Sequence, residues 1–362
     1  MPMSKRNLFA AIAIWMAGAA LQPALAQEPF YKGKRLTVLV NYAAGGPTDV
    51  EGRLFAKHVS RHIDGAPGVL VQNMDGAGGL IGTNWLGEIA PKDGTVIGYL
   101  TGAAWQSASD QTPRRVDFRS YEFVAYQPGT SVYFARTDLP PGMKVATDIV
   151  KAQGMIIGGL GVDNAKDILL RMTMDMLGVK FKYVTGYKGS QGARMALQQG
   201  EINFYSESPP SYRAIIEPGL VAEGAAIPIF YDPGYNGVAF RTPKQMEGVD
   251  ILPYHELYKK IKGVEPSGPY WDAYRTVIAL NGAMQRMLVM PPQAPPAAIE
   301  AVRKAIHAMS EDKEYQAECL KTFGFVPEYV AESSVNDQVR KALSVEPAMK
   351  TFITDYAKNL PR

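Results

Sequence analysis

The sequence predicts an α/β protein of two lobes, and three observations lead to that class. Short apolar runs rich in β-branched residues alternate with helical stretches through the first hundred residues, which is the order of a sheet covered by helices. A breaker at 127–130 is followed by a second series of the same kind. The chain of 362 residues is also longer than one hydrophobic core usually serves.

The first series supplies the elements of one sheet. We expect strands at 36–41, 69–73 and 95–100, and helices at 49–63 and 80–89. This strand and helix order favours a parallel sheet, whose ligands gather beyond the carboxyl ends of the strands.

The second series begins after the breaker. Strands are expected at 132–135, 155–158, 180–185 and 202–206, with helices at 163–177 and 193–199. The run at 226–231, followed by Asp232-Pro233-Gly234, predicts a return to the first lobe. Residues 240–290 give no clear assignment, and 297–323 has the apolar spacing of helices.

The predicted organisation follows from these elements. A leader occupies 1–26, the first lobe comprises 27–128 and 233–362, and the second lobe comprises 129–232. Two crossover strands between the lobes, at 127–130 and 231–234, make a hinge, which is the geometry of proteins that close around a ligand.

The N-terminus is typical of a secretory signal peptide. Lys5 and Arg6 precede an apolar run at 8–21 and a small-residue cleavage site at 23–26. We therefore expect an exported, periplasmic protein. Loss of the leader lowers the formal net charge from +3 to +1, which gives no nucleic-acid footprint. The one cysteine, Cys319, is expected to be a packed thiol.

Two glycine-rich turns carry the functional signal. The first glycine turn, 43–49, and the second glycine turn, 73–82, each follow a predicted strand and open a helix. Unpaired backbone N–H groups and the positive end of a helix dipole converge at such a place, and this suits an anionic oxygen group. Two neighbouring turns predict a clamp for a small carboxylate or phosphate.

An enzyme is the main alternative class. The second glycine turn approaches a dinucleotide fingerprint, but Ile81 stands at the third glycine position and no acidic residue ends the next strand. Neither turn is followed by a P-loop lysine. His58 and His62 have a spacing that zinc can use, yet with Lys57 and Arg61 beside them they indicate a solvated polar face. We therefore expect no catalytic residue, metal or cofactor.

Several motifs, taken in order, resemble the Bug family, the periplasmic receptors of tripartite tricarboxylate transporters. An aromatic residue, two glycines and an aspartate match at Tyr42, Gly45, Gly46 and Asp49, followed by Arg53. The segment from Asn73 to Thr83, the Tyr187-Lys188-Gly189 turn and the block from Met290 to Tyr315 match further family patterns. The likeness covers nearly all of the chain after the leader.

The resemblance implies a Venus flytrap, the two-lobe fold of periplasmic binding proteins, with a carboxylate held by the two turns. Carried over position by position, the contacts are Tyr42, Ala44, Gly45, Gly46, Thr48, Asp49, Ala77, Gly78 and Gly79. It also implies a monomer that hands its ligand to membrane permease subunits. A ligand sensor that feeds a signalling partner is the alternative. Dicarboxylate, tricarboxylate, aromatic acid and amino acid all stay open as ligands.

We expect residues of the second lobe and aromatic side chains to contact the far end of the ligand. The candidates are Trp105, Gly161, Asp163, Asn164, Tyr187 and Lys188. Asp163 is either a helix N-cap or a partner for a donor or ammonium on the ligand. Lys188 is either solvated or the counterion of a second carboxylate. Trp105 and Tyr187 either form aromatic walls or simply pack.

Overall fold

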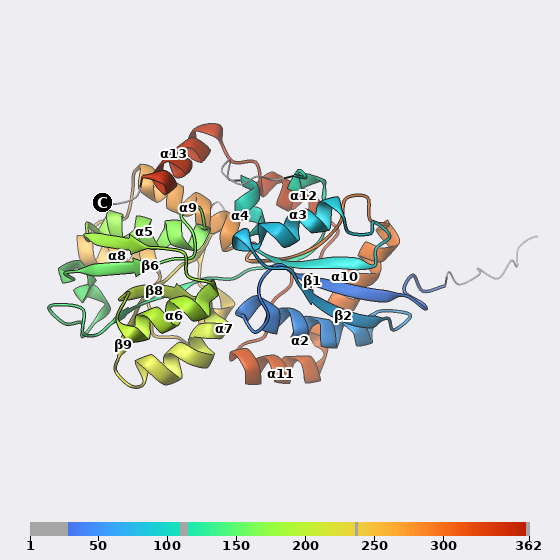
Figure 1. Cartoon of the computed structure of the whole chain (residues 1–362), viewed down its shortest axis with the longest axis horizontal. Coiled ribbons are helices and arrows are strands. Elements are labelled where there is room, and N and C mark those ends of the chain that lie inside the picture. The colour runs from blue at the N-terminus through green and yellow to red at the C-terminus, as the bar shows by residue number, and fades with distance from the viewer. Residues whose placement is uncertain (1–27, 109–114, 236–237, 360–362) are drawn as a thin grey trace, which may run out of the picture.

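The computed structural model describes residues 28–108, 115–235 and 238–359. It confirms the α/β class with two lobes, which lie side by side along the long axis in Figure 1. A five-stranded sheet forms the centre of each lobe. The predicted leader at 1–26 lies outside the described residues. In the part of the chain that is described, no helix has the length and apolar character needed to cross a membrane.

The first sheet has the strand order β2-β1-β3-β12-β4. Its strands are β1 (Arg35–Val40), β2 (Gly68–Asn73), β3 (Val96–Thr101), β4 (Glu122–Gln127) and β12 (Arg286–Met290). β1 pairs in parallel with both β2 and β3, so the carboxyl ends of these three strands share one edge. Each glycine turn leaves that edge, the first after β1 and the second after β2.

The first sheet is mixed, whereas the sequence favoured a wholly parallel one. β12 runs antiparallel between β3 and β4, and it comes from the stretch 240–290 that local patterns left unassigned. All five residues of β12 are buried, so its run carries no alternation. Its place in the sheet depends on pairing with strands more than 150 residues away, which a local pattern does not report.

The second sheet has the order β7-β6-β8-β5-β9. Its strands are β5 (Val132–Arg136), β6 (Met155–Gly158), β7 (Phe181–Val184), β8 (Phe204–Glu207) and β9 (Ala226–Tyr231). β6 is parallel to β7 and β8, while β5 is antiparallel to β8 and β9. The carboxyl ends of β6, β7 and β8 therefore also share an edge.

Helices cover both sheets. Those between the strands of the first sheet are α2 (Pro47–His62), η1 (Ala77–Gly79), α3 (Leu80–Glu88), α4 (Ala103–Ala108) and η2 (Phe118–Ser120). The second sheet is interleaved with η3 (Ala146–Lys151), α5 (Ala165–Leu177), α6 (Gly189–Gln199), α7 (Pro209–Ser211) and the π-helix η4 (Tyr212–Val221). After β9 come β10 (Gly234–Tyr235), β11 (Phe240–Arg241), η5 (Lys244–Met246), α8 (Tyr254–Lys262), α9 (Pro269–Asn281), α10 (Pro296–Glu311), α11 (Lys313–Phe323), α12 (Val335–Ala342) and α13 (Pro347–Lys358).

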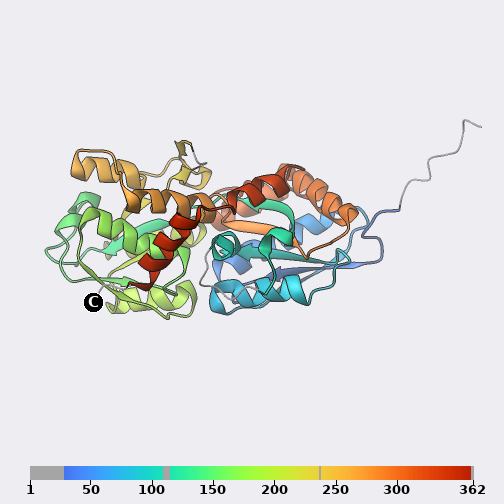
Figure 2. The same cartoon turned by 90° about the horizontal axis from the view of Figure 1, so that it is seen from above.

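The later helices divide between the lobes. α8 and α9 pack against α5, whereas α10 packs against α2 and α12 against β4. Figure 2 shows the red α13 reaching back over the second lobe, where the carbonyl of Ala357 accepts a hydrogen bond from Arg171 at 3.3 Å. The chain therefore passes between the lobes at 128–131, 282–285 and 343–346. The return to the first lobe expected at 231–234 is therefore wrong, because α8 and α9 still pack on the second lobe and the chain re-enters the first sheet only at β12. The other boundaries expected for the lobe segments stay predictions.

Two apolar clusters form the core. One lies between the first sheet and α2, α10 and α11, with Val38 and Val40 of β1 pointing into it. The other includes Leu39 of the same strand and continues from the opposite face of the first sheet into the second lobe. Successive side chains of a strand point to opposite faces, so β1 joins both clusters. Cys319 is fully buried in the first cluster, and burial raises the pKa of its thiol to about 12.

The prediction of a solvated face at His58 is wrong. His58 is fully buried, and its Nε2 lies 2.6 Å from Glu318 Oε2 of α11. With Glu314 these groups come close enough to hold a metal, but Lys57 Nζ lies 2.7 Å from Glu318 and Arg61 Nη1 lies 2.7 Å from Glu314. The cations occupy the carboxylates, so the cluster is an ion-pair network that joins α2 to α11.

Candidate ligand-binding site between the lobes

The first glycine turn is held by the aspartate that follows it. Asp49, in the first turn of α2, accepts a hydrogen bond from Gly45 N at 2.8 Å and from Arg53 Nε at 2.9 Å. Asn73 Nδ2 donates to its other oxygen at 2.8 Å. Burial alone would raise the pKa of Asp49, but these three partners hold it below its usual value. Asp49 therefore stays ionised and fixes the loop, and is itself 2% exposed.

The start of α2 is left open for an anion. Its N-cap is Gly46, whose position carries no side-chain hydrogen bond, and Pro47 stands at the first helical position. The amides of the first helical turn have no intrahelical acceptor, and the helix dipole favours negative charge beside them. Thr48 is buried there, with Oγ1 3.0 Å from Thr101 Oγ1 at the end of β3.

The second glycine turn is fixed through its carbonyl groups. The Gly78 carbonyl accepts from Tyr42 Oη at 2.9 Å and from Gln106 Nε2 at 2.6 Å. The Gly79 carbonyl accepts from Asn41 Nδ2 at 3.2 Å and from Thr83 Oγ1 at 3.0 Å. Gly79 N donates to the Gly76 carbonyl at 3.0 Å, whereas the amides of Ala77 and Gly78 have no acceptor among the described residues and are the ones open to a ligand.

Glycine is required at position 79 of this turn. Its φ is +96°, and a Cβ added there would approach Asn41 Nδ2 far inside contact distance. Asn41 is also the residue that joins the turn to β3, since its Oδ1 accepts from Thr101 N at 2.9 Å. Sequence reasoning missed Asn41, Thr101 and Gln106. The position of Asn41 directly before the first turn was the available signal.

The corresponding edge of the second lobe is the first turn of α5. Asn164 caps this helix, since its Oδ1 accepts from Lys166 N at 3.0 Å. The interpretation of Asp163 as the N-cap is therefore wrong by one residue. Asp167 accepts from Gly161 N at 2.7 Å and from Tyr183 Oη at 2.7 Å. The loop 159–164 is thus held as the first glycine turn is, by an aspartate in the following helix.

Contacts between the lobes place these two edges face to face. Trp105 Nε1 of α4 donates to the carbonyl of Asp163 at 2.8 Å. Burial raises the pKa of Tyr42 to about 12, and Asn164, Asp163 and Asp167 are among the groups that act on it. We call this region the interlobe face: the two glycine turns, Tyr42 and Trp105 on one side, and 161–167 on the other.

Two predicted residues lie in the turn before α6, where Tyr187 N donates to the Gly159 carbonyl at 3.4 Å, so this turn borders the loop 159–164. Lys188 is exposed just before α6, where it makes no side-chain cap. Burial raises the pKa of Tyr187, and Glu201, beyond the other end of α6, acts in the same direction. Tyr187 is therefore near Glu201, and no contact between Tyr187 and Trp105 is found among the described residues. Their pairing as aromatic walls stays a prediction.

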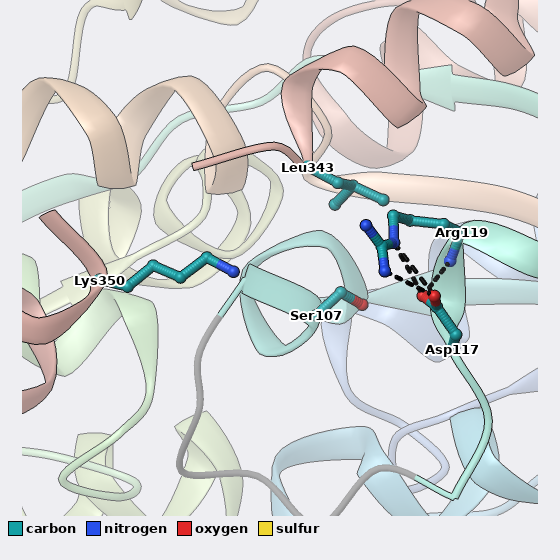
Figure 3. Close-up of a pocket in the computed structure, with 5 residues that line it drawn as sticks. All are labelled: Ser107, Asp117, Arg119, Leu343 and Lys350. Carbon is teal, nitrogen blue, oxygen red and sulfur yellow. Dashed lines mark hydrogen bonds and ion pairs between the residues drawn. The ribbon is translucent and has the colours of Figure 1, made fainter. Parts of the chain in front are cut away.

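Figure 3 shows a separate pocket at the end of α4, lined by Ser107, Asp117, Arg119, Leu343 and Lys350. Residues of neither glycine turn line it. Arg119 Nη2 lies 2.8 Å from Asp117 Oδ2, so its charge is already paired within η2 and its N-cap. The pocket is not part of the interlobe face.

Comparison with known proteins adds to this geometry. No family model matches the chain. It is 32% identical over 194 residues to the "UPF0065 protein in the TAR-I ttuE-ttuC' intergenic region" of Agrobacterium vitis, a match over 51% of this chain and 54% of that protein. It is 27% identical to the "UPF0065 protein in gbd 5'region" of Cupriavidus necator, in a match that covers 57% of this chain and 64% of that protein. The chain thus spans about half to two thirds of the curated relatives it matches.

Solved structures match almost the whole chain. The periplasmic binding protein BugD covers 90% of this chain and 95% of its own, with a TM-score of 0.61 at 20% identity. The fold that the resemblance to the Bug family implies is confirmed. MatC from Rhodopseudomonas palustris, solved with malate, has a TM-score of 0.61 at 15% identity, and the match covers 89% of this chain and 98% of MatC. Another R. palustris protein, solved with adipate, has a TM-score of 0.66 at 16% identity, and the match covers 91% of this chain and 98% of that protein.

The Bug-type fold explains why the motifs lie where they do. A two-lobe α/β protein of this kind brings the carboxyl ends of its parallel strands to the interlobe face. The glycine motifs that carried the resemblance follow β1 and β2 and thus meet at that face.

Proposed function

We propose that this chain is a periplasmic solute receptor that binds a small organic carboxylate between its lobes and passes it to a membrane permease of the tripartite tricarboxylate type. It acts as a monomer and catalyses no reaction. Two of the solved Bug-type neighbours were determined with malate and with adipate, both carboxylates.

One observation carries the proposal. The two glycine turns leave one sheet edge together, side chains hold the carbonyls of the second turn, and the N-cap of α2 after the first turn makes no side-chain hydrogen bond. The carboxylate then accepts from backbone amides of the two turns that no acceptor of the described residues takes, those of Thr48, Ala77 and Gly78, with the Thr48 and Tyr42 hydroxyl groups beside them. Backbone donors lose no side-chain entropy on binding, and charge-assisted hydrogen bonds are among the stronger ones.

Closure follows from the contacts that cross between lobes. A ligand shifts an equilibrium between open and closed forms only by the contacts it gains in the closed form. Trp105 already reaches Asp163 across the interlobe face. A carboxylate on the glycine turns whose far end touches 161–167 adds to that contact and favours the closed form, which is the form a permease would recognise.

A thermal-shift screen tests the proposal. The chain from Gln27 onward is heated alone and with malate, adipate, glutamate, benzoate, glucose, ATP or zinc. Ligand at 100 times its Kd adds about 2.7 kcal/mol of stability, which raises the melting temperature by a few degrees. A shift with one or more of the acids supports the proposal. A shift with ATP or zinc and none with any acid overturns it.

A matched pair of variants then locates the site. Gly78→Val places a branched side chain on the second turn, where φ is +64° and Gln106 Nε2 is 3.2 Å away from an added Cβ. Gly154→Val introduces the same residue at a similar φ of +70° before β6, with open space around it. We expect Gly78→Val to abolish the acid-induced shift and Gly154→Val to keep it. Equal affinity in both variants would contradict the clamp.

A further inference from the structure

We propose that Lys166 of the second lobe binds a second carboxylate on the ligand, so that this receptor selects diacids over acids with a neutral far end. This inference rests on the proposed function, since it names the partner of the ligand's other end. Sequence analysis left Lys188 as either solvated or the holder of that carboxylate, and the structure shows Lys188 exposed in the turn before α6.

The position of Lys166 is set by α5. It is the second residue of a helix whose preceding loop contacts the first lobe through Trp105 and Asp163. The next residue, Asp167, is among the groups that act on Tyr42 from across the interlobe face. Lys166 therefore belongs to the helical turn that faces the first lobe.

The environment of the Lys166 ammonium is unfavourable without an anion. Nζ donates to Tyr205 Oη at 2.7 Å and lies 3.9 Å from the centre of the same ring. An ammonium has three donors, and one neutral hydroxyl is the acceptor that the described residues show. Burial lowers the pKa of Lys166, and the positive end of the α5 dipole opposes a cation in the first turn.

The two nearby carboxylates, Glu207 and Asp167, each bind other groups of the second lobe. Glu207, at the end of β8, is 2.9 Å from Arg194 of α6, and both side chains are largely buried. Asp167 uses one oxygen for Gly161 N and Tyr183 Oη. Glu207 and Asp167 act on Lys166 at longer range and favour its charged form, whereas Arg194 disfavours it. Among the described residues no carboxylate lies within 4.0 Å of Nζ. The ammonium therefore lacks a direct anionic partner, which a carboxylate of the ligand would supply.

The two lobes also correspond at this position. In each, an aspartate at the third position of the helix accepts from the N–H of a loop glycine, Gly45 in one and Gly161 in the other. The residue before that aspartate is Thr48 in the first lobe and Lys166 in the second. Thr48 is a candidate contact for the first carboxylate, and Lys166 has the equivalent place opposite it.

A second helix start adds to the site. Tyr205 Oη, the partner of Lys166, has the Ser190 side chain of α6 as a hydrogen-bond partner. α6 begins at Gly189 and runs for 11 residues, so its positive end and that of α5 converge on the Lys166 and Tyr205 pair. A carboxylate between them would gain the ammonium and both dipoles.

The test compares acids that differ only at one end. Affinities of the chain from Gln27 onward are measured by calorimetry for succinate, glutarate and adipate, and for the monoamide of each. We expect the best-fitting diacid to bind at least tenfold more tightly than its own monoamide. Lys166→Met should lower the diacid affinity about 10- to 100-fold and leave the monoamide affinity within about threefold. Lys180→Met is the matched control, since Lys180 is exposed before β7 at the end of that strand away from the interlobe face, and it should change neither.

The outcomes separate the inference from the proposed function. Binding of diacid and monoamide with equal affinity by the unchanged protein overturns the role of Lys166, even if the variant does not fold. The same holds if Lys166→Met weakens both ligands equally. If the acid panel of the thermal-shift screen gives no shift at all, the proposed function fails instead. The melting temperature of Lys166→Met without ligand should equal or exceed that of the unchanged protein, because a buried cation is removed from a helix start.

Discussion

Asp49 of the first lobe and Asp167 of the second each fix the loop that precedes their helix, but their electrostatic surroundings are opposite. Each lies at the third position of its helix and accepts from a loop glycine N–H, at 2.8 Å and 2.7 Å. Asp49 is also bound by Arg53 and Asn73. Asp167 has Tyr183, while its Oδ1 has no hydrogen-bond partner within the described part of the chain. The shared geometry is local, but the partners come from distant strands.

The difference appears in the two pKa values. Arg53, Gly45 N–H and Asn73 overcome the effect of burial and lower the pKa of Asp49. Burial raises the pKa of Asp167 to about 6, against the hydrogen bonds from Tyr183 and Gly161. One loop is therefore held by a stable carboxylate and the other by a carboxylate that resists ionisation. An identical substitution at both positions should separate the two cases.

Asp49→Asn should have the largest effect. The amide loses the charge that Arg53 binds and sets an NH₂ group against the NH₂ of Asn73, so we expect a loss of about 2–3 kcal/mol in the free energy of unfolding at pH 7. Urea denaturation measures this loss. The contribution of Asp49 is present above its unfolded pKa, which is near 3.8, and is lost as the pH falls through the lower folded value. A variant as stable as the unchanged protein at pH 7 would contradict the assigned partners.

Asp167→Asn should give the opposite result. Its one oxygen can still accept from Gly161 and Tyr183, and no charge is buried. The folded pKa of Asp167 is raised, so the stability it contributes is present below its unfolded pKa of 3.8 and is lost as the pH rises through about 6. We expect the variant to lack this loss. Its free energy of unfolding, measured by urea denaturation, should exceed that of the unchanged protein by roughly 1–3 kcal/mol at pH 8. Parallel pH curves for the two proteins would show that Asp167 does not titrate as described.

Trp105→Phe should have the smallest effect, because it removes one hydrogen bond between the lobes and keeps an aromatic ring. Loss of the Nε1 donor to the Asp163 carbonyl should cost about 1 kcal/mol of the closed form. The acid affinity should fall severalfold, which calorimetry measures, with scattering in solution to detect a more open average shape. Unchanged affinity and shape would mean that this contact does not support closure.

The ionic network at His58 shows where sequence reasoning stops. Two histidines one helical turn apart, with Lys57 and Arg61 beside them, have the pattern of a solvated face. The fold instead places α11 on that side of α2, and Glu318 binds His58 at 2.6 Å across 260 residues of sequence. A local pattern reports which residues share a face, but it does not report what packs there.

The sequence by itself determined the alternating elements of both lobes and the two glycine turns, because apolar periodicity and glycine turns act over a few residues. Their meeting at one edge followed from the parallel pairing that such an order implies. The tertiary structure decided the rest. It placed β12 within the first sheet, made Asn164 the cap of α5, and set Lys166 beside Tyr205. These outcomes depend on strand pairing and charge environments assembled from distant segments, which no local pattern contains.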